Sequence, residues 1–231
     1  MTVKKMCKVV LFDLDGTLVD SSEGILNAAK EAISRMGMEP PSNDEIRSCI
    51  GPPVGETLES IMDWSGYQKK EFYSIFRPIY KDKYVFQCEL YPGMMQLLNE
   101  LNEKGMFIGI ATNKRKDSTE SLLQYLKIDR LFDTVIAQDQ NDIRNKADMI
   151  LDALKELRTV KEEAVMIGDT IGDLDAARNA GVDFIGVRYG FGFKETIKDD
   201  IEFVDSVDEL KRLLLQYDFK TDGLRSALFH L

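Results

Sequence analysis

Short apolar segments alternate with longer helix-like segments along most of the chain, and this alternation limits the possible folds more than any other feature of the sequence. Continuous apolar runs rich in β-branched residues are typical of strands that are buried on both faces. We expect strands at residues 7–12, 106–111, 134–137, 164–167 and 184–187. Helical patterns lie between the later runs, at residues 92–103, 117–126, 146–157 and 171–180. The alternation predicts an α/β fold with a doubly wound, Rossmann-like parallel sheet.

The segment between the first and second apolar runs departs from this pattern. It has helical periodicity at residues 23–36, 54–62 and 68–83 without a convincing strand, and it is interrupted at Pro40-Pro41 and Gly51-Pro52-Pro53. We interpret it as a helical cap domain, residues 20–87, inserted into a catalytic core formed by residues 1–19 and 88–231. A chain of 231 residues is long enough for one core and a smaller insertion. For residues 218–231, an added helix and a disordered end are both open.

The charge balance and the hydropathy limit the partners that we expect. The chain has 40 acidic and 30 basic side chains, a formal charge of -10, and a negative surface repels nucleic acids and anionic membranes. The apolar run before residue 13 is too short for a signal peptide, and no stretch approaches the ~20 apolar residues of a membrane span. We therefore expect a cytoplasmic protein that binds neither nucleic acid nor membrane; the sequence does not indicate its oligomeric state.

Cysteine and histidine usage excludes several kinds of catalytic site. The three cysteines are widely spaced and form no CxxC motif, so we expect free thiols and not a disulfide framework or a cysteine zinc site. The one histidine, His230, lies next to the C-terminus, which rules out a multi-histidine metal site. Catalysis then has to depend on carboxylate, lysine, threonine or serine side chains.

The first candidate motif follows the first predicted strand and contains Asp13, Asp15, Gly16 and Thr17. Residues two apart can point to the same side as the chain leaves a strand, so the two carboxylates can lie side by side. Their repulsion favours a cation between them, and Gly16 permits a tight turn whose backbone N–H groups face an anion. A nucleophile beside a proton donor and acceptor is what two-step phosphoryl transfer requires. A turn capped by an aspartate would explain one of these carboxylates easily and two poorly.

Polar residues also follow three of the other predicted strands. Thr112 and Asn113 could donate hydrogen bonds to phosphoryl oxygens, and Lys146, at the start of a predicted helix, could neutralise a phosphoryl group. Each of these signals is weak alone, because threonine and asparagine commonly cap helices and most lysines are merely solvated. Asp169 follows the fourth strand and Asp173 lies about one helical turn later; carboxylate oxygens suit a hard cation such as Mg²⁺. The carboxyl ends of parallel strands meet at one edge of the sheet, so these residues can converge on one site.

The motifs together resemble the haloacid dehalogenase-like hydrolase superfamily, in order and spacing over nearly the whole chain. The matching residues are Asp13 to Thr17, Thr112, Lys146, Asp169 and Asp173, and the helical insertion resembles the family's cap domain. Within the superfamily, residues 50–53 and the end of the last motif look most like the phosphoglycolate phosphatase group. Dehalogenases of the family lack the second aspartate, so Asp15 favours phosphoryl transfer. Thr17 favours a phosphatase over the sugar-phosphate mutases, which often have valine there.

The resemblance implies a Mg²⁺-dependent phosphatase with a phosphoaspartate intermediate on Asp13 and a small phosphorylated metabolite as substrate. Asp15 would act as general acid and base, and Thr112 and Lys146 would hold the phosphoryl oxygens. Mg²⁺ would be bound by Asp13, Asp169 and the backbone carbonyl of Asp15, with Asp173 in support. We expect Gly16, Thr17, Asn113 and Arg47 to bind substrate, Arg47 from the cap, although a solvated role for Arg47 is equally open. Four aromatic residues at helical spacing are expected to form the cap core: Trp64, Phe72, Tyr73 and Phe76.

Other functions are also compatible with the sequence. A 5′-nucleotidase, another small-phosphate phosphatase or a phosphomutase could use the same scaffold. In a different class, a phospho-acceptor signalling domain also uses aspartate, threonine and lysine on a parallel sheet. Its acceptor follows a middle strand, however, whereas Asp13 follows the first. A non-catalytic binding protein with a vestigial site is disfavoured because the set of motifs is complete.

Overall fold

A computed structural model describes residues 7–51, 53–139, 144–193 and 201–217. Six parallel strands form its main sheet, in the order β5-β4-β1-β6-β7-β8. The strands are β1 (Val9–Phe12), β4 (Phe107–Arg115), β5 (Thr134–Gln138), β6 (Ala164–Gly168), β7 (Asp183–Val187) and β8 (Glu202–Val204). The predicted parallel sheet is confirmed, and β8 is an additional edge strand that we did not predict. Residues 218–231, including His230, lie outside the described part of the chain.

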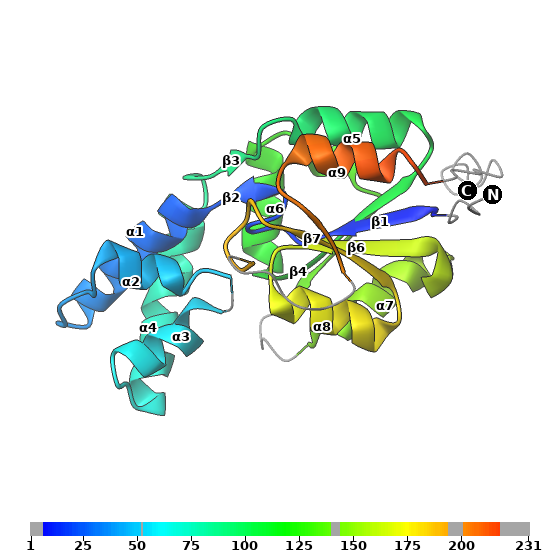
Figure 1. Ribbon diagram of the computed structural model, residues 1–231. Helices are drawn as coiled ribbons and strands as arrows, with labels where there is room; N and C mark the ends of the chain where they lie inside the picture. The colour runs from blue at the N-terminus through cyan, green and yellow to red at the C-terminus, as the bar shows by residue number, and fades with distance from the viewer. Residues whose placement is uncertain (1–6, 52, 140–143, 194–200, 218–231) are drawn as a thin grey trace.

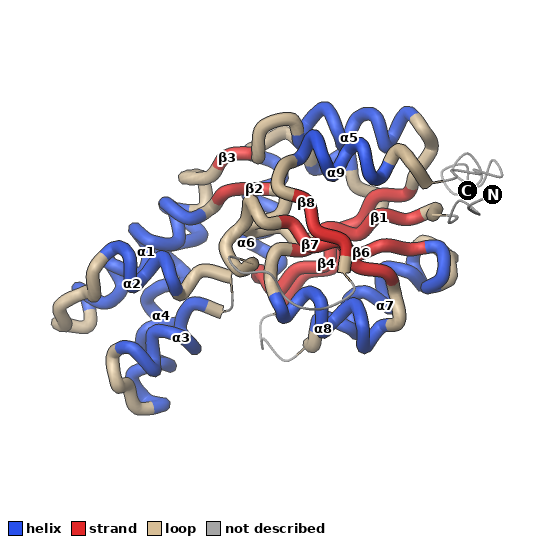
Figure 2. Tube along the Cα trace, viewed as in Figure 1, coloured by secondary structure: helices blue, strands red, loops and turns tan. Residues whose placement is uncertain are grey.

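Helices cover both faces of the sheet, as Figures 1 and 2 show. Val10 and Phe12 of β1 belong to one hydrophobic cluster, which also extends into the inserted helices, whereas Val9 and Leu11 belong to a second cluster. This separation follows from the two-residue period of a strand, which sends successive side chains to opposite faces. The first face carries α5 (Met94–Glu103), α6 (Lys116–Tyr125) and α9 (Val207–Leu214), and the second carries α7 (Lys146–Glu156) and α8 (Ile171–Ala180).

The strand register decides which chain segments meet at the carboxyl edge of the sheet. Phe12 lies opposite Ile110 of β4 on one side and Ile167 of β6 on the other. The residues that follow these three positions therefore leave the sheet beside one another. β4 continues to Arg115, four residues further than predicted, with an irregularity in its pairing between Thr112 and Arg115.

The inserted segment is helical, and Figure 1 shows it beside the sheet and not on either of its faces. It contains α1 (Ser22–Arg35), α2 (Asn43–Ser48), α3 (Val54–Ile61), α4 (Gly66–Ile79) and one π-helical turn, η1 (Tyr80–Tyr84). Helix α2 was not predicted; it has only six residues and begins at a capping box between Ser42 and Glu45. As expected, Trp64, Phe72 and Phe76 are buried and Tyr73 packs against them. No helix in the described residues has the length and apolar character to span a bilayer.

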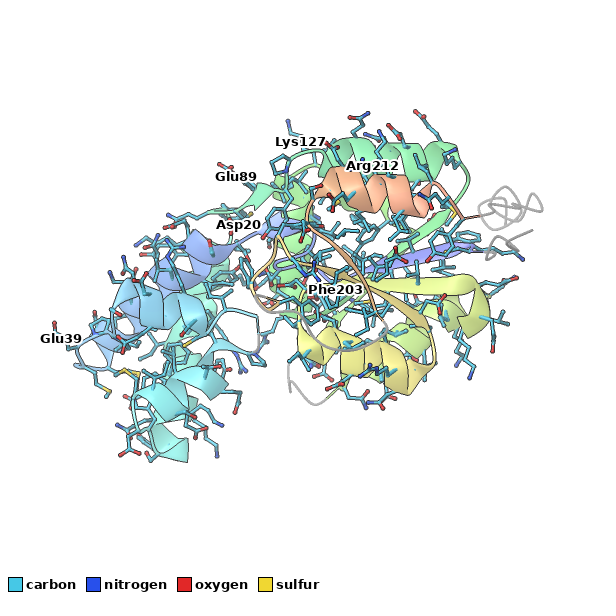
Figure 3. All side chains as sticks on the ribbon, viewed as in Figure 1. Asp20, Glu39, Glu89, Lys127, Phe203 and Arg212 are labelled. Carbon is cyan, nitrogen blue, oxygen red and sulfur yellow. The ribbon has the colours of Figure 1, made fainter. Side chains whose placement is uncertain are left out.

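The helix expected at residues 68–83 is not a uniform α-helix. Pro78 has no N–H to donate along the helix, and after Ile79 the backbone widens into the π turn, in which the Val85 N–H donates to Tyr80 O at 2.7 Å. A short antiparallel ribbon, β2 (Val19–Asp20) with β3 (Glu89–Leu90), then joins the insertion to the sheet. Figure 3 labels Asp20 and Glu89 on its two strands. The division of the chain after residues 19 and 87 stays a prediction.

Candidate active site at the carboxyl edge of the sheet

The loop after β1 places Asp13 and Gly16 against the end of β6. The Asp13 N–H donates to Ile167 O at 2.9 Å, which continues the strand pairing by one residue, and the Asp13 side chain is buried. Gly16 has φ +87°, and a Cβ at this position would lie 2.3 Å from Asp169 Oδ2. Only glycine combines this backbone conformation with so close an approach.

We expected Gly16 and Thr17 to bind substrate, and these contacts stay predictions; in the structure both residues have partners within the protein. The Gly16 N–H donates to Val19 O at 2.8 Å, within the turn. Thr17 is completely buried, and its hydroxyl donates to Asp169 Oδ1 at 3.2 Å. Both residues therefore shape the loop and orient Asp169.

Asp13, Asp169 and Asp173 form a buried acidic cluster in which each offers an oxygen within 4.8 Å of the others. Asp169 lies in the cluster because it directly follows β6, and Asp173 because it lies in the first turn of α8. One Asp173 oxygen accepts hydrogen bonds from the Thr170 N–H and hydroxyl in a capping box. Burial, opposed by Lys146 and reinforced by Asp173, raises the pKa of Asp13 to about 7. Burial and the charges of Asp13 and Asp173 raise the pKa of Asp169 to about 8.

Lys146 lies between two members of this acidic cluster. Its Nζ donates to Asp13 Oδ1 at 2.5 Å and also contacts Asp173 Oδ1. Lys146 is the first residue of α7, whose N-cap Asn145 accepts a hydrogen bond from the Asp148 N–H. Burial alone would lower the pKa of Lys146, but the two carboxylates outweigh it and raise the pKa above its usual range. The lysine identified by spacing thus lies in direct contact with the predicted nucleophile.

The Asp15 carboxylate lies outside the acidic cluster and has different partners. It accepts a hydrogen bond from the Ser21 hydroxyl at 2.6 Å. Lys114 Nζ lies 3.0 Å from each of its oxygens and 2.5 Å from the hydroxyl of Tyr80. We predicted neither Lys114 nor Tyr80 as a site residue. The sequence signal for Lys114 was its position two residues after Thr112, directly beyond a buried strand.

A second unpredicted element is the loop of residues 189–193, which holds Asp169 in place. The Phe191 N–H donates to Asp169 Oδ2 at 2.7 Å, and the Phe193 N–H donates to the Asp169 carbonyl at 3.0 Å. A Cβ at Gly190 would lie 2.3 Å from Gly16 O and 2.4 Å from Asp169 Cβ. Two glycines alternating with aromatic residues directly after a predicted strand are the signal that could have identified this loop.

The remaining predicted residues are not all brought to the cluster. Thr112 is buried beyond the end of the paired β1–β4 segment, and its hydroxyl oxygen accepts from the Lys114 N–H at 3.2 Å. The Asn113 side chain is exposed. The Arg47 guanidinium contacts Glu23 and, at 3.5 Å, the hydroxyl of Ser22, so the structure pairs it with α1. Their proposed substrate contacts stay predictions.

The cap reaches the site at Gly51. A Cβ at Gly51 would lie 3.4 Å from the Thr170 side chain and 3.9 Å from Phe191 Cβ. Gly51 therefore lies against the core beside the acidic cluster. Pro52 lies outside the described residues.

The acidic cluster has the composition of a divalent-cation site. When all three carboxylates are ionised, they and the one lysine carry a net negative charge in a buried position, which is strongly unfavourable unless a cation compensates it. Hard oxygen donors suit Mg²⁺. The residues present therefore fit the metal that the sequence motifs imply.

The chain is similar in sequence to several known proteins. The chain is similar to "Tyrosine-protein kinase PtkA" of Mycobacterium tuberculosis, at 30% identity over 96% of this chain and 72% of that protein. It is also similar to the "Phosphoglycolate phosphatase" of Nitrosococcus oceani, at 31% identity over 92% and 98% of the two chains. A "5'-nucleotidase" of Pseudomonas aeruginosa is 30% identical over 82% and 86%.

Solved structures show the same fold. The crystal structure of a predicted phosphatase from Clostridium acetobutylicum has a TM-score of 0.84 at 29% identity, covering 91% of this chain and 99% of the other. The family model described as haloacid dehalogenase-like hydrolase matches residues 10–187. This span contains the complete cluster of Asp13, Lys146, Asp169 and Asp173, and the chain therefore belongs to the haloacid dehalogenase-like hydrolase family and is one of its phosphatases.

Proposed function

We propose that this phosphatase is Mg²⁺-dependent and hydrolyses a small phosphate monoester, phosphoglycolate or a close analogue, through a phosphoaspartate on Asp13. One observation carries the proposal. Asp13, at the carboxyl end of the central strand β1, shares a buried cluster with Asp169, Asp173 and Lys146. A nucleophilic carboxylate, a cation-binding set and a fixed positive charge are the groups that phosphoryl transfer requires.

The chain's own residues supply the steps of the reaction. The Asp13 carboxylate attacks phosphorus while the ester P–O bond breaks, and Asp15 gives its proton to the departing oxygen. Asp15 then removes a proton from water, which attacks the phosphoaspartate and releases inorganic phosphate with Asp13 regenerated. Lys146 and Thr112 hold the phosphoryl oxygens. Asp13, Asp169 and the Asp15 carbonyl, with Asp173 in support, would hold Mg²⁺, which would supply the positive charge that lets an anionic substrate approach these carboxylates.

A second candidate transfers the phosphoryl group from ATP to an acceptor other than water. The similarity to a protein named tyrosine-protein kinase, whose structure has a TM-score of 0.80 with this chain at 29% identity, raises transfer to a tyrosine hydroxyl. In that case Asp15 would deprotonate the phenol in place of water. Labelled ATP with a tyrosine-containing peptide distinguishes the two: label on the peptide supports transfer, and label released only as phosphate supports hydrolysis.

The experiment for the main proposal measures phosphate release from p-nitrophenyl phosphate with and without Mg²⁺. Asp13→Asn removes the nucleophile and should abolish turnover, whereas Asp175→Asn, an exposed position on the same helix as Asp173, should retain it. Acid-quenched wild-type protein should carry one added phosphoryl group at Asp13 by mass spectrometry. Turnover retained in Asp13→Asn would contradict the proposal. A panel of phosphoglycolate, nucleoside monophosphates, pyrophosphate and sugar phosphates then ranks the substrates.

A further inference from the structure

Lys114 occupies a buried position between the core and the cap. Its side chain is 6% exposed. Its Nζ contacts both oxygens of Asp15 and the hydroxyl of Tyr80, and it lies 4.5 Å from the centroid of the Tyr80 ring. Burial would lower the pKa of Lys114, but Asp15 and Tyr80 outweigh it and raise the pKa above its usual range. The ammonium group has three N–H bonds, and these three oxygens account for them.

Tyr80 brings the cap into this contact. It opens the π-helical turn that follows Pro78, and such turns often occur at functional positions. Its ring stacks on Phe76 at 5.5 Å with an interplanar angle of 10°. A continuous row of rings then leads through the cap, from Phe76 to Phe72 at 5.2 Å and from Phe72 to Trp64 at 5.2 Å. The hydrophobic core of the cap therefore ends directly on the lysine that holds Asp15.

This arrangement couples two parts of the molecule that are joined in sequence only by the β2–β3 ribbon. Lys114 belongs to β4 of the core sheet, and Tyr80 to the inserted helices. A movement of the cap that displaces Tyr80 removes one of three partners from a buried ammonium group. Because a buried charge without its partners is costly, Lys114 and the Asp15 carboxylate would have to rearrange with it.

We propose that Lys114 is a positioning residue that holds the Asp15 carboxylate toward the leaving-group oxygen. Through Tyr80, this positioning depends on cap seating, by which we mean the contact between Tyr80 of the cap and Lys114 of the core. The inference rests on the proposed function, in which Asp15 protonates the departing oxygen. Asp15 is then correctly placed only while the aromatic row of the cap contacts Lys114. Cap seating thereby controls proton transfer directly, in addition to covering the site.

If Asp15 is misplaced, the loss of activity depends on the leaving group of the substrate. An alkyl phosphate needs a proton on its leaving oxygen as the P–O bond breaks, whereas p-nitrophenolate leaves as a stable anion. Misplacing Asp15 therefore slows phosphorylation of Asp13 by an alkyl ester more than by p-nitrophenyl phosphate. The ratio of kcat/KM for the two esters, measured on one preparation, does not depend on the fraction of protein that is folded.

The test compares this ratio in wild-type protein, Lys114→Met and Tyr80→Phe. Lys116→Met, at a lysine whose side chain is 73% exposed, and Tyr67→Phe, at an exposed tyrosine of α4, are the matched controls. We expect kcat/KM for the alkyl ester to fall about 10²-fold in Lys114→Met, within the contribution of general acid catalysis, with a much smaller fall for the aryl ester. Tyr80→Phe, which removes only the hydroxyl, should lower the ratio in the same direction by about tenfold or less. Both controls should keep the wild-type ratio.

Each outcome is decisive. An unchanged ratio in Lys114→Met, or an equal loss on both esters, overturns the positioning role. A lower ratio in Lys114→Met but not in Tyr80→Phe overturns the dependence on the cap. Wild-type protein without Mg²⁺-dependent turnover, or turnover retained in Asp13→Asn, refutes the proposed function itself and is seen before any variant at positions 80 or 114 is compared.

Discussion

Removing divalent cations should make the stability of this protein fall as the pH rises from about 5 to 8. Burial raises the pKa of Asp13 from its ordinary value of 3.8 to about 7 and that of Asp169 from 3.8 to about 8. Because the pKa values of the two carboxyl groups are higher in the folded protein than in the unfolded chain, the folded protein binds more protons at every pH between the unfolded and the folded pKa. The contribution to stability is therefore fully present below about pH 4 and is lost as the pH rises through 7 to 8.

The size of the effect follows from these values. For Asp13 alone, the rise from about pH 5 to its pKa of about 7 spans two powers of ten, which is about 3 kcal/mol at 1.36 kcal/mol each. For a chain of this length, 1 kcal/mol shifts Tm by about 2–4 °C, so we expect a fall of about 6–12 °C. Asp169 acts in the same direction, but the two carboxylates interact and their effects do not add. Mg²⁺ binds the ionised cluster, so saturating Mg²⁺ should flatten the dependence and its binding should release protons.

Thermal unfolding of chelator-treated protein, with and without saturating Mg²⁺, measures this prediction across the pH range. Calorimetric titration of Mg²⁺ in buffers of different ionisation enthalpy measures the protons released. Asp169→Asn is the matched variant, since an amide of nearly the same shape cannot ionise; its chelated form should show a smaller slope, which Asp13 alone maintains. A Tm of the chelated wild-type protein that is constant between about pH 5 and 8 would refute the burial argument, as would Mg²⁺ binding without proton release.

Two further predictions concern the loop at residues 189–193 and the cap. Gly190→Ala places a Cβ against Gly16 O and Asp169. A displacement of about 1 Å at a catalytic group costs about 10²-fold in activity, so we expect kcat to fall by about that factor. Gly66→Ala, where a Cβ meets nothing within 4 Å, is the control, and equal kcat in both variants would contradict the packing role of the loop. Arg47→Ala breaks an exposed ion pair and should change the free energy of unfolding by less than about 1 kcal/mol. If Arg47 binds a substrate carboxylate, this variant raises KM for phosphoglycolate but not for p-nitrophenyl phosphate, and an unchanged KM for both would leave it a surface residue.

The sequence alone was sufficient to predict the helices and strands that show a clear pattern within their own residues. Buried parallel strands are continuous apolar runs in the sequence, so five of the six strands of the main sheet and the helices between them were predicted within a few residues. Asp13, Lys146 and Asp169 could be placed at one edge because each lies where a strand ends or the next helix begins. Local patterns were weakest for short elements: α2 and β8 have too few residues to show a period.

Only the tertiary structure decided which side chains share a partner. Lys114 and Asp15 lie 99 residues apart, and Thr17 and Asp169 lie 152 apart; no periodicity in the sequence reports such pairs. The motif around Thr17 predicts a substrate contact, which stays a prediction, but only the tertiary structure shows that its hydroxyl donates to Asp169. Tyr80 contacts Lys114 from the junction between α4 and the π turn, and the helical pattern of residues 68–83 does not predict this junction. Apolar burial along the chain determines the fold, but the orientation of each polar group depends on which buried charge lies nearest to it in space.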